Sequence, residues 1–177
     1  MKKIVTVLLV LFLSSPLLGQ NGYSFGSGSM VIGGNAGISA LGFGFGGSFE
    51  FGFSKTWGIQ ANYNINSYDV AGGKWSIAPL DLWATYHNEK PFGGFGDASY
   101  YMGGVSIASL SFEPANGKES KGTGTLFGFG YGTIFNMSSN LNAYVELRYR
   151  LGSLEDDANN KLIISWYSAY AGVTFSL

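Results

Sequence analysis

The chain has 177 residues, of which 16% are aromatic, only 12% are charged and 28 are glycine. So few charges argue against a disordered chain, and so much glycine argues against a helical bundle, because glycine costs about 1 kcal/mol per helical position relative to alanine. With no cysteine, one histidine and a formal net charge of −1, we expect no disulfide framework, no metal or cofactor site and no nucleic-acid partner.

Residues 1–19 are predicted to be a secretory signal peptide. The basic pair Lys2-Lys3 precedes an apolar run over residues 4–13 that only Thr6 interrupts. This run is too short to cross a bilayer as a helix, which takes about 20 residues. We expect cleavage after Gly19, then a short N-terminal segment over residues 20–29 and a single domain over residues 30–177.

Apolar side chains alternate with polar or small ones in eight segments after residue 30. In the stretch LGFGFGGSFEFGFS, five phenylalanines share one parity, while glycine, serine and Glu50 occupy the other. Side chains two residues apart point to the same face of a β-strand, so each segment predicts a strand with one apolar face. The predicted strands span residues 30–39, 41–54, 57–66, 75–87, 96–112, 123–137, 141–152 and 163–177.

The predicted connections alternate between short turns and longer charged loops. Within residues 96–112 the parity is ambiguous, so we expect a β-bulge there. Pro79 cannot donate to a ladder, so we expect it at a bulge or at the start of the membrane-crossing part of its strand. The short turns are predicted at residues 54–56, 88–91 and 137–140, and the longer loops at 69–74, 113–121 and 153–161, with a very short link near 40–42.

The two faces of the predicted strands differ too strongly for a soluble protein. One face carries most of the charges, and the other is a nearly continuous apolar surface of a size that soluble monomers do not expose. The pattern fits a transmembrane barrel, in which apolar side chains face lipid and backbone hydrogen bonds close around the ring. The residues predicted to face lipid are Phe43, Phe45, Phe49, Phe51, Phe53, Val145, Leu147 and Phe175.

These features together resemble a known class of bacterial proteins. The signal peptide, the eight alternating segments, the alternating connections and the final run over residues 167–177 resemble small outer-membrane β-barrels of the OmpA/OmpX-like class and the broad "outer membrane protein beta-barrel domain" family. The expected fold is an all-β, eight-stranded antiparallel up-and-down transmembrane barrel behind a cleaved signal peptide. The resemblance implies the bacterial outer membrane as location, outer-membrane lipids, lipopolysaccharide and the insertion machinery as partners, and a monomer.

An eight-stranded barrel has an interior just wide enough for side chains to fill. Buried charges need partners, so the charged residues of inward parity are predicted to form an ion-pair network, with Glu50 and Asp81 as the acidic partners across the lumen. We expect this network to plug the barrel, and the alternative is a gated pore lined by the same charges. The predicted lumen charge network comprises Glu50, Asp81, Glu146, Arg148 and Arg150.

The main functional hypothesis is an integral outer-membrane barrel without enzymatic activity, with an envelope structural or surface-contact role. The alternative is a small pore or transporter for ions or an apolar ligand. A third hypothesis is a lipid-modifying enzyme, because some barrels of this size resemble lipid A acyltransferases or deacylases that use a histidine near the outer rim. His87, the only histidine, is predicted at the periplasmic end, so we predict no catalytic residue.

Overall fold

The computed structural model describes residues 25–156 and 159–177, which fold into a closed ring of eight antiparallel strands. Each strand pairs with its neighbour in the chain, and β1 closes the ring by pairing with β8. The predicted all-β, eight-stranded barrel is confirmed. Its strands are β1 (Met30–Ser39), β2 (Gly42–Gly52), β3 (Trp57–Val70), β4 (Gly73–Asn88), β5 (Ala98–Pro114), β6 (Ser120–Asn136), β7 (Leu141–Asp156) and β8 (Lys161–Ser176).

Part of the chain lies outside the strands. The predicted signal peptide over residues 1–19, its cleavage site and residues 20–24 lie outside the described residues. A short 3-10 helix, η2 (Phe92–Gly94), lies between β4 and β5. Among residues 25–156 and 159–177, no helix is long and apolar enough to cross a membrane.

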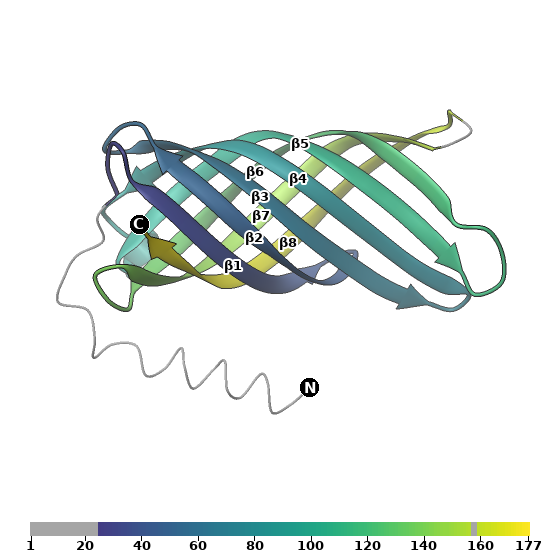
Figure 1. The fold of residues 1–177 in the computed structure, drawn as a ribbon, viewed down its shortest axis with the longest axis horizontal. Coiled ribbons are helices and arrows are strands. Elements are labelled where there is room, and N and C mark those ends of the chain that lie inside the picture. Colours follow the sequence, from purple (N-terminus) through teal and green to yellow (C-terminus); the bar gives the residue numbers. More distant parts are fainter. Residues whose placement is uncertain (1–24, 157–158) are drawn as a thin grey trace, which may run out of the picture.

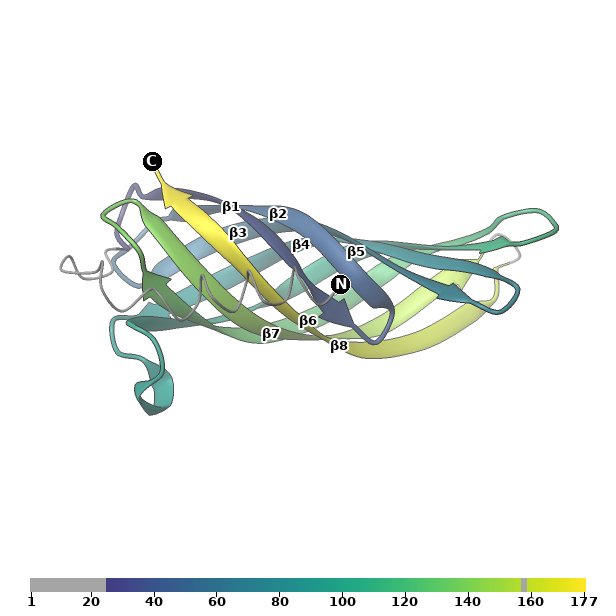
Figure 2. The same ribbon diagram turned by 90° about the horizontal axis from the view of Figure 1, so that it is seen from below.

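The two ends of the barrel differ in shape (Figure 1). The start of β1, the end of β8 and the connections β2–β3, β4–β5 and β6–β7 lie at one end, which we call the terminal end. The other connections lie at the opposite end, which we call the hairpin end. There the β3–β4 and β5–β6 hairpins extend well beyond the β1–β2 turn (Figure 2).

Several connections differ in length from the sequence-based prediction. The loop predicted over residues 69–74 is mostly strand, because β3 continues to Val70 and β4 begins at Gly73. Opposite charges face each other across these hairpins, as in the pairs Asp69↔Lys74 and Glu155↔Lys161. Such cross-strand pairs stabilise a ladder without apolar side chains. Conversely, the short turn predicted at 88–91 is part of the connection over residues 89–97.

The bulge predicted within residues 96–112 is absent from the described strands, and Pro79 does not lie at a bulge. The alternative, that Pro79 begins the membrane-crossing part of its strand, stays a prediction. β5 pairs residue for residue with β6 from Ala98↔Ile134 to Phe112↔Ser120, so no residue is inserted. Pro79 lies in the middle of β4, where pairing with β3 is interrupted between Tyr63↔Leu80 and Asn66↔Ile77. Because the gap has equal length on both strands, it is a local loss of pairing at a residue without an N–H group rather than a bulge.

Burial alternates along the strands, so the barrel has a polar interior and an apolar exterior. On β3, for example, Gln60, Asn62 and Asn64 are buried, whereas Ile59 and Tyr63 are exposed. The seven outward phenylalanine and leucine side chains predicted to face lipid are 39–61% exposed, and Val145 is half-buried. These seven are Phe43, Phe45, Phe49, Phe51, Phe53, Leu147 and Phe175.

Candidate functional site in the barrel lumen

Asp81 and two arginines form a buried layer of ion pairs midway along β4 and β7, which we call the charge layer. Arg150 contacts Asp81 through Nε to Oδ1 at 3.0 Å and through Nη2 to Oδ2 at 2.6 Å. Arg148 donates from Nη1 to Oδ2 of the same carboxylate at 3.2 Å. All three side chains are fully buried. Asp81 is therefore the shared partner that compensates both guanidinium groups.

Arg148 has a second acidic partner on its own strand. Its Nη2 contacts a carboxylate oxygen of Glu146 and donates to Oδ1 of Asn62 at 3.0 Å. The hydroxyl of Tyr100 donates to the other oxygen of Glu146 at 2.8 Å. With Glu146 included, the charge layer holds two positive and two negative side chains. This balance is what burying four charges requires.

Aromatic rings fill the space around the two guanidinium groups. The Trp83 ring centroid lies 5.6 Å from the guanidinium carbon of Arg148 and 5.1 Å from that of Arg150. Tyr170 lies 5.0 Å from Arg148, and contacts of this kind are attractive. A Cβ atom at Gly128 would lie only 2.5 Å from Trp83. Glycine at this position of β6 therefore makes room for the indole ring.

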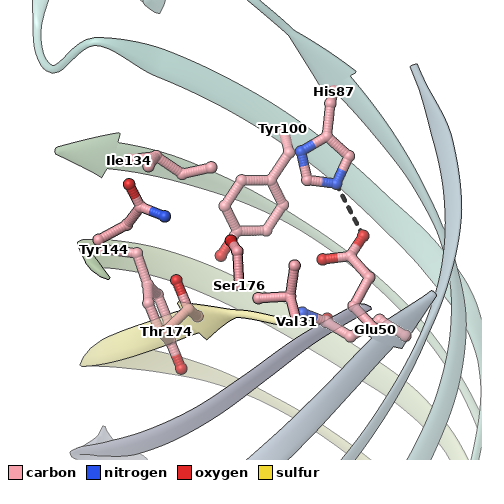
Figure 3. Close-up of a pocket in the computed structure, with 10 residues that line it drawn as sticks. Val31, Glu50, His87, Tyr100, Ile134, Tyr144, Thr174 and Ser176 are labelled. Atoms are coloured by element: carbon pink, nitrogen blue, oxygen red, sulfur yellow. Dashed lines mark hydrogen bonds and ion pairs between the residues drawn. The ribbon is translucent and has the colours of Figure 1, made fainter. Parts of the chain in front are cut away.

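Glu50 belongs to a different cluster, nearer the terminal end (Figure 3). Its Oε1 accepts a hydrogen bond from the hydroxyl of Thr85 and lies 2.7 Å from Nε2 of His87. The ring of Phe25 stacks on His87 with 3.7 Å between centroids. The structure thus gives Glu50 a threonine and a histidine as partners, where an arginine was expected.

The cavity at this cluster is small. It has a volume of about 20 Å³ and is lined by residues from all eight strands, including Glu50, His87 and Tyr144. This is room for about one water molecule. The hydroxyl of Thr85 donates to Glu50, so its proton points to a carboxylate rather than to an imidazole. The Thr85 hydroxyl is therefore not arranged as a nucleophile activated by His87.

On the other side of the charge layer, toward the hairpin end, the lumen contains a group of apolar side chains beside the buried amide of Asn66. A buried group packs together there, with Leu41, Leu110 and Ile164 partly buried against it. We call this group the apolar lumen cluster. Its members are Ile77, Ala108, Leu126, Leu154 and Trp166.

Parity alone could not identify two of these groupings. It places Glu50, Thr85 and His87 on inward faces, but their meeting depends on strand register. Glu50 pairs with Gln60 and Gln60 with Trp83, which brings Glu50 close to the next inward position, Thr85. The apolar lumen cluster was missed because Ile77, Leu126 and Leu154 are apolar residues of inward parity and so depart from the alternation on which the prediction rested.

Comparison with known proteins identifies the fold. No protein-family model and no curated protein matches the sequence. The N-terminal β-barrel domain of Pseudomonas aeruginosa OprF has a TM-score of 0.60 at 20% identity, over 86% of this chain and 100% of that one. Neisserial surface protein A (NspA) has a TM-score of 0.64 at 15% identity, over 83% and 95%. Pseudomonas aeruginosa OprG, an outer membrane protein, has a TM-score of 0.58 at 12% identity, over 88% and 98%.

The chain therefore has the fold of the small eight-stranded outer-membrane β-barrels, and the resemblance drawn from the sequence is confirmed at that level. Its apolar exterior and polar lumen have the polarity that a lipid environment requires of such a barrel. Fold and surface polarity together match those of these solved outer-membrane barrels.

Proposed function

We propose that this protein is a non-enzymatic outer-membrane barrel with an envelope structural or surface-contact role and a lumen closed by side chains. The charge layer carries this proposal. Arg148 and Arg150 share Asp81, and the ring of Trp83 lies against both guanidinium groups. An open pore would hydrate these charges, whereas here each guanidinium group is neutralised and enclosed by protein atoms.

The membrane contacts are part of the same proposal. The outward side chains of β2, among them Phe45 and Phe49, would face lipid acyl chains and lipopolysaccharide, with assembly by the outer-membrane insertion machinery. The terminal end would face the periplasm, and the projecting hairpins would face outward, as in related barrels. Surface contact would then be made by the β3–β4, β5–β6 and β7–β8 hairpins, and the barrel would act as a monomer.

The proposal of a closed lumen is tested by electrical recording. Purified protein inserted into a planar bilayer should give no discrete conductance steps, while a general porin in the same bilayer serves as the positive control. Steps that appear with the wild-type protein and change size in Arg148→Met would show a hydrated pore lined by that residue. Transport would then replace the structural role.

The absence of enzymatic activity has its own test. The mass of lipid A from cells that express the protein should equal that from cells that express His87→Ala. A mass difference of one acyl chain that depends on His87 would contradict the proposal, since it would assign that histidine a catalytic role.

A further inference from the structure

Residues 25–29, which precede β1, fold back against the terminal end of the barrel, and we call them the N-terminal turn. The hydroxyl of Ser29 donates to the carbonyl of Gly26 at 2.7 Å and closes the turn. The N–H of Gly28 donates to the carbonyl of Gly52, the last residue of β2, at 2.7 Å. The N–H of Gly52 donates in return to the carbonyl of Ser29 at 2.9 Å. These bonds fix the base of the turn to the barrel wall.

Phe25, at the tip of the N-terminal turn, lies in the terminal mouth of the lumen. Its ring stacks on the imidazole of His87 with 3.7 Å between centroids and 15° between planes. The ring of Tyr100 also stacks on this imidazole, at 5.4 Å. A Cβ atom at inward-facing Gly52 or Gly58 would lie 3.0 or 2.8 Å from Cζ of Phe25. The ring therefore fills a slot that these two glycines leave open at the ends of β2 and β3.

The ring of Phe25 covers the pair that Glu50 and His87 form in the lumen. His87 is only 4% exposed, and its Nε2 lies 2.7 Å from Oε1 of Glu50 (Figure 3). The cavity beside the pair has room for about one water molecule. Toward the middle of the barrel, the charge layer fills the lumen. A solute larger than water therefore has to approach the imidazole from the terminal mouth, where Phe25 stands in its way.

The base and the tip of the N-terminal turn are held by different kinds of contact. Backbone hydrogen bonds hold the base, whereas none among residues 25–156 and 159–177 joins Phe25 to a strand. Phe25 is half-buried and is held by ring contacts, which add only a modest stabilisation beyond burial. Gly26, the next residue, gives the backbone at this junction the freedom to rotate. The tip can therefore detach while the base and the barrel stay intact.

We propose that the N-terminal turn is a tethered lid on the terminal mouth of the lumen. Phe25 docks on His87 in the closed state and swings away in an open state, which admits small solutes to the Glu50–His87 pair. The charge layer is in place in both states, so the lid controls access to the pair and not passage through the barrel. This inference goes beyond the structural role and does not depend on the direction in which the barrel is inserted.

Chemical modification of His87, the only histidine of the chain, tests the lid. Diethyl pyrocarbonate transfers an ethoxycarbonyl group to an imidazole nitrogen and releases ethanol and carbon dioxide. It is added to folded protein in detergent micelles, and mass spectrometry of the peptide that contains His87 gives the rate. Phe25→Ala should raise this rate by about tenfold or more, because reactivity follows the fraction of molecules in the open state. Phe25→Tyr keeps the ring and should stay within about twofold of the unaltered protein. The matched control Phe53→Ala, which removes an exposed ring just after β2, should leave the rate unchanged.

A second variant displaces the lid without changing Phe25. The added Cβ atom of Gly52→Ala would lie 2.3 Å from the carbonyl oxygen of Gly26, so the base of the N-terminal turn has to shift. His87 should then react faster than in the unaltered protein. Gly34→Ala is the matched control, because its Cβ atom would have no neighbour closer than 4.0 Å, and it should leave the rate unchanged.

The reaction of the unaltered protein separates a lid from a fixed part of the wall. With a lid, His87 reacts slowly but to completion, and the modified protein still shifts its migration on heating in gel electrophoresis, as a folded barrel does. Modification that proceeds only where the barrel unfolds would make Phe25 a fixed plug and overturn the proposal. Equal rates in the unaltered protein, Phe25→Ala and Gly52→Ala would overturn it as well, since Phe25 would then not control access. If one of these variants fails to fold, the rate in the other decides.

Discussion

The charge layer and the apolar lumen cluster occupy neighbouring levels of the same lumen but are filled by opposite chemistry. In the charge layer, Arg148 and Arg150 are held by specific carboxylate oxygens. In the apolar lumen cluster, Ile77, Leu126 and Leu154 fill space by shape alone. The same wall of strands separates both levels from lipid. The membrane therefore does not determine whether the side chains at a given level of the lumen are charged or apolar.

The difference shows that the composition of the lumen can vary along the barrel axis, whereas that of the outer face cannot. Its outer face must be apolar throughout the hydrocarbon region, because an exposed charge there costs several kcal/mol. Its lumen has no such constraint, so the side chains at each level can be selected for packing or for binding. The charge layer is filled by paired charged side chains, whereas the apolar lumen cluster adjoins an open pocket of about 480 Å³.

Asp81→Asn should produce the largest loss of stability, because it breaks the charge layer and leaves the two arginines with Glu146 as their remaining acid. Removing one partner of a buried ion pair costs about 3–5 kcal/mol. Urea-induced unfolding of the barrel in vesicles, followed by tryptophan fluorescence, measures the change in the free energy of unfolding.

The double variant Asp81→Asn/Arg150→Met is the control for that prediction. It removes a positive charge together with the negative one, so part of the stability should return. The single variants Asp81→Asn and Arg150→Met are measured as well. If the double variant loses as much free energy of unfolding as the two single variants added together, charge balance does not govern this layer.

Phe49→Arg tests whether the outer face of β2 lies in the hydrocarbon region of the bilayer. Phe49 lies on β2 and is exposed on the barrel surface, so an arginine there should cost about 2–4 kcal/mol if it lies near the bilayer midplane. Phe53→Arg is the matched control, because Phe53 has the same parity but follows the end of β2. Near the interface its cost should fall to about 0–1 kcal/mol. Equal costs at both positions would mean that β2 does not cross a bilayer.

Inward Asn62 is unsuitable as a neutral site for such a comparison. From parity alone we would expect an arginine at Asn62 to be milder than one at Phe49. In the structure Asn62 is buried and accepts a hydrogen bond from Arg148, so a third guanidinium group there would face an existing one. Because of this contact with Arg148 across the lumen, Asn62→Arg is expected to be more destabilising than parity alone predicts.

Ile77→Val tests how tightly the apolar lumen cluster is packed. Removing one buried methylene group costs about 0.5–1.5 kcal/mol. Ile107→Val on β5 removes the same group from a side chain that is 64% exposed on the outer surface, so its cost should be smaller. The same unfolding assay measures both. Equal losses would indicate that Ile77 contributes no packing beyond that of a lipid-facing residue.

Period-two alternation was enough to predict eight strands and their faces, because the pleat fixes side-chain direction locally. Contacts across the lumen depend on the register of all the strands between the partners. Asp81 therefore meets Arg148 and Arg150 from β7, whereas Glu50 meets His87 from β4. Neither pairing follows from either strand alone.

The connections were harder to predict for a related reason. Charged residues such as Asp69 and Lys74 interrupt the apolar alternation and so suggested loops, yet they pair across a β-hairpin. Beyond the hydrocarbon region a strand no longer needs an apolar face, so the hydropathy pattern ends before the ladder does. The difference in length between β1, which ends at Ser39, and its neighbour β8, which continues to Lys161, is likewise not encoded in the hydropathy pattern.

Lys121→Ala should produce the smallest loss of stability. It compares an ion pair exposed to solvent with the buried ion pairs of the charge layer. Lys121 lies 3.1 Å from Glu119 near the start of β6, and both side chains are largely exposed to solvent, at 62% and 42%. Exposed pairs contribute about 0–1 kcal/mol, because water and salt screen the attraction and ordering the side chains costs entropy. The free energy of unfolding should therefore change by a small fraction of the Asp81→Asn effect, and the change should shrink further in high salt.

Because the lumen pairs are fully buried, salt should leave the Asp81→Asn effect nearly unchanged. A loss in Lys121→Ala comparable to that in Asp81→Asn would show that burial is not what separates the two regions.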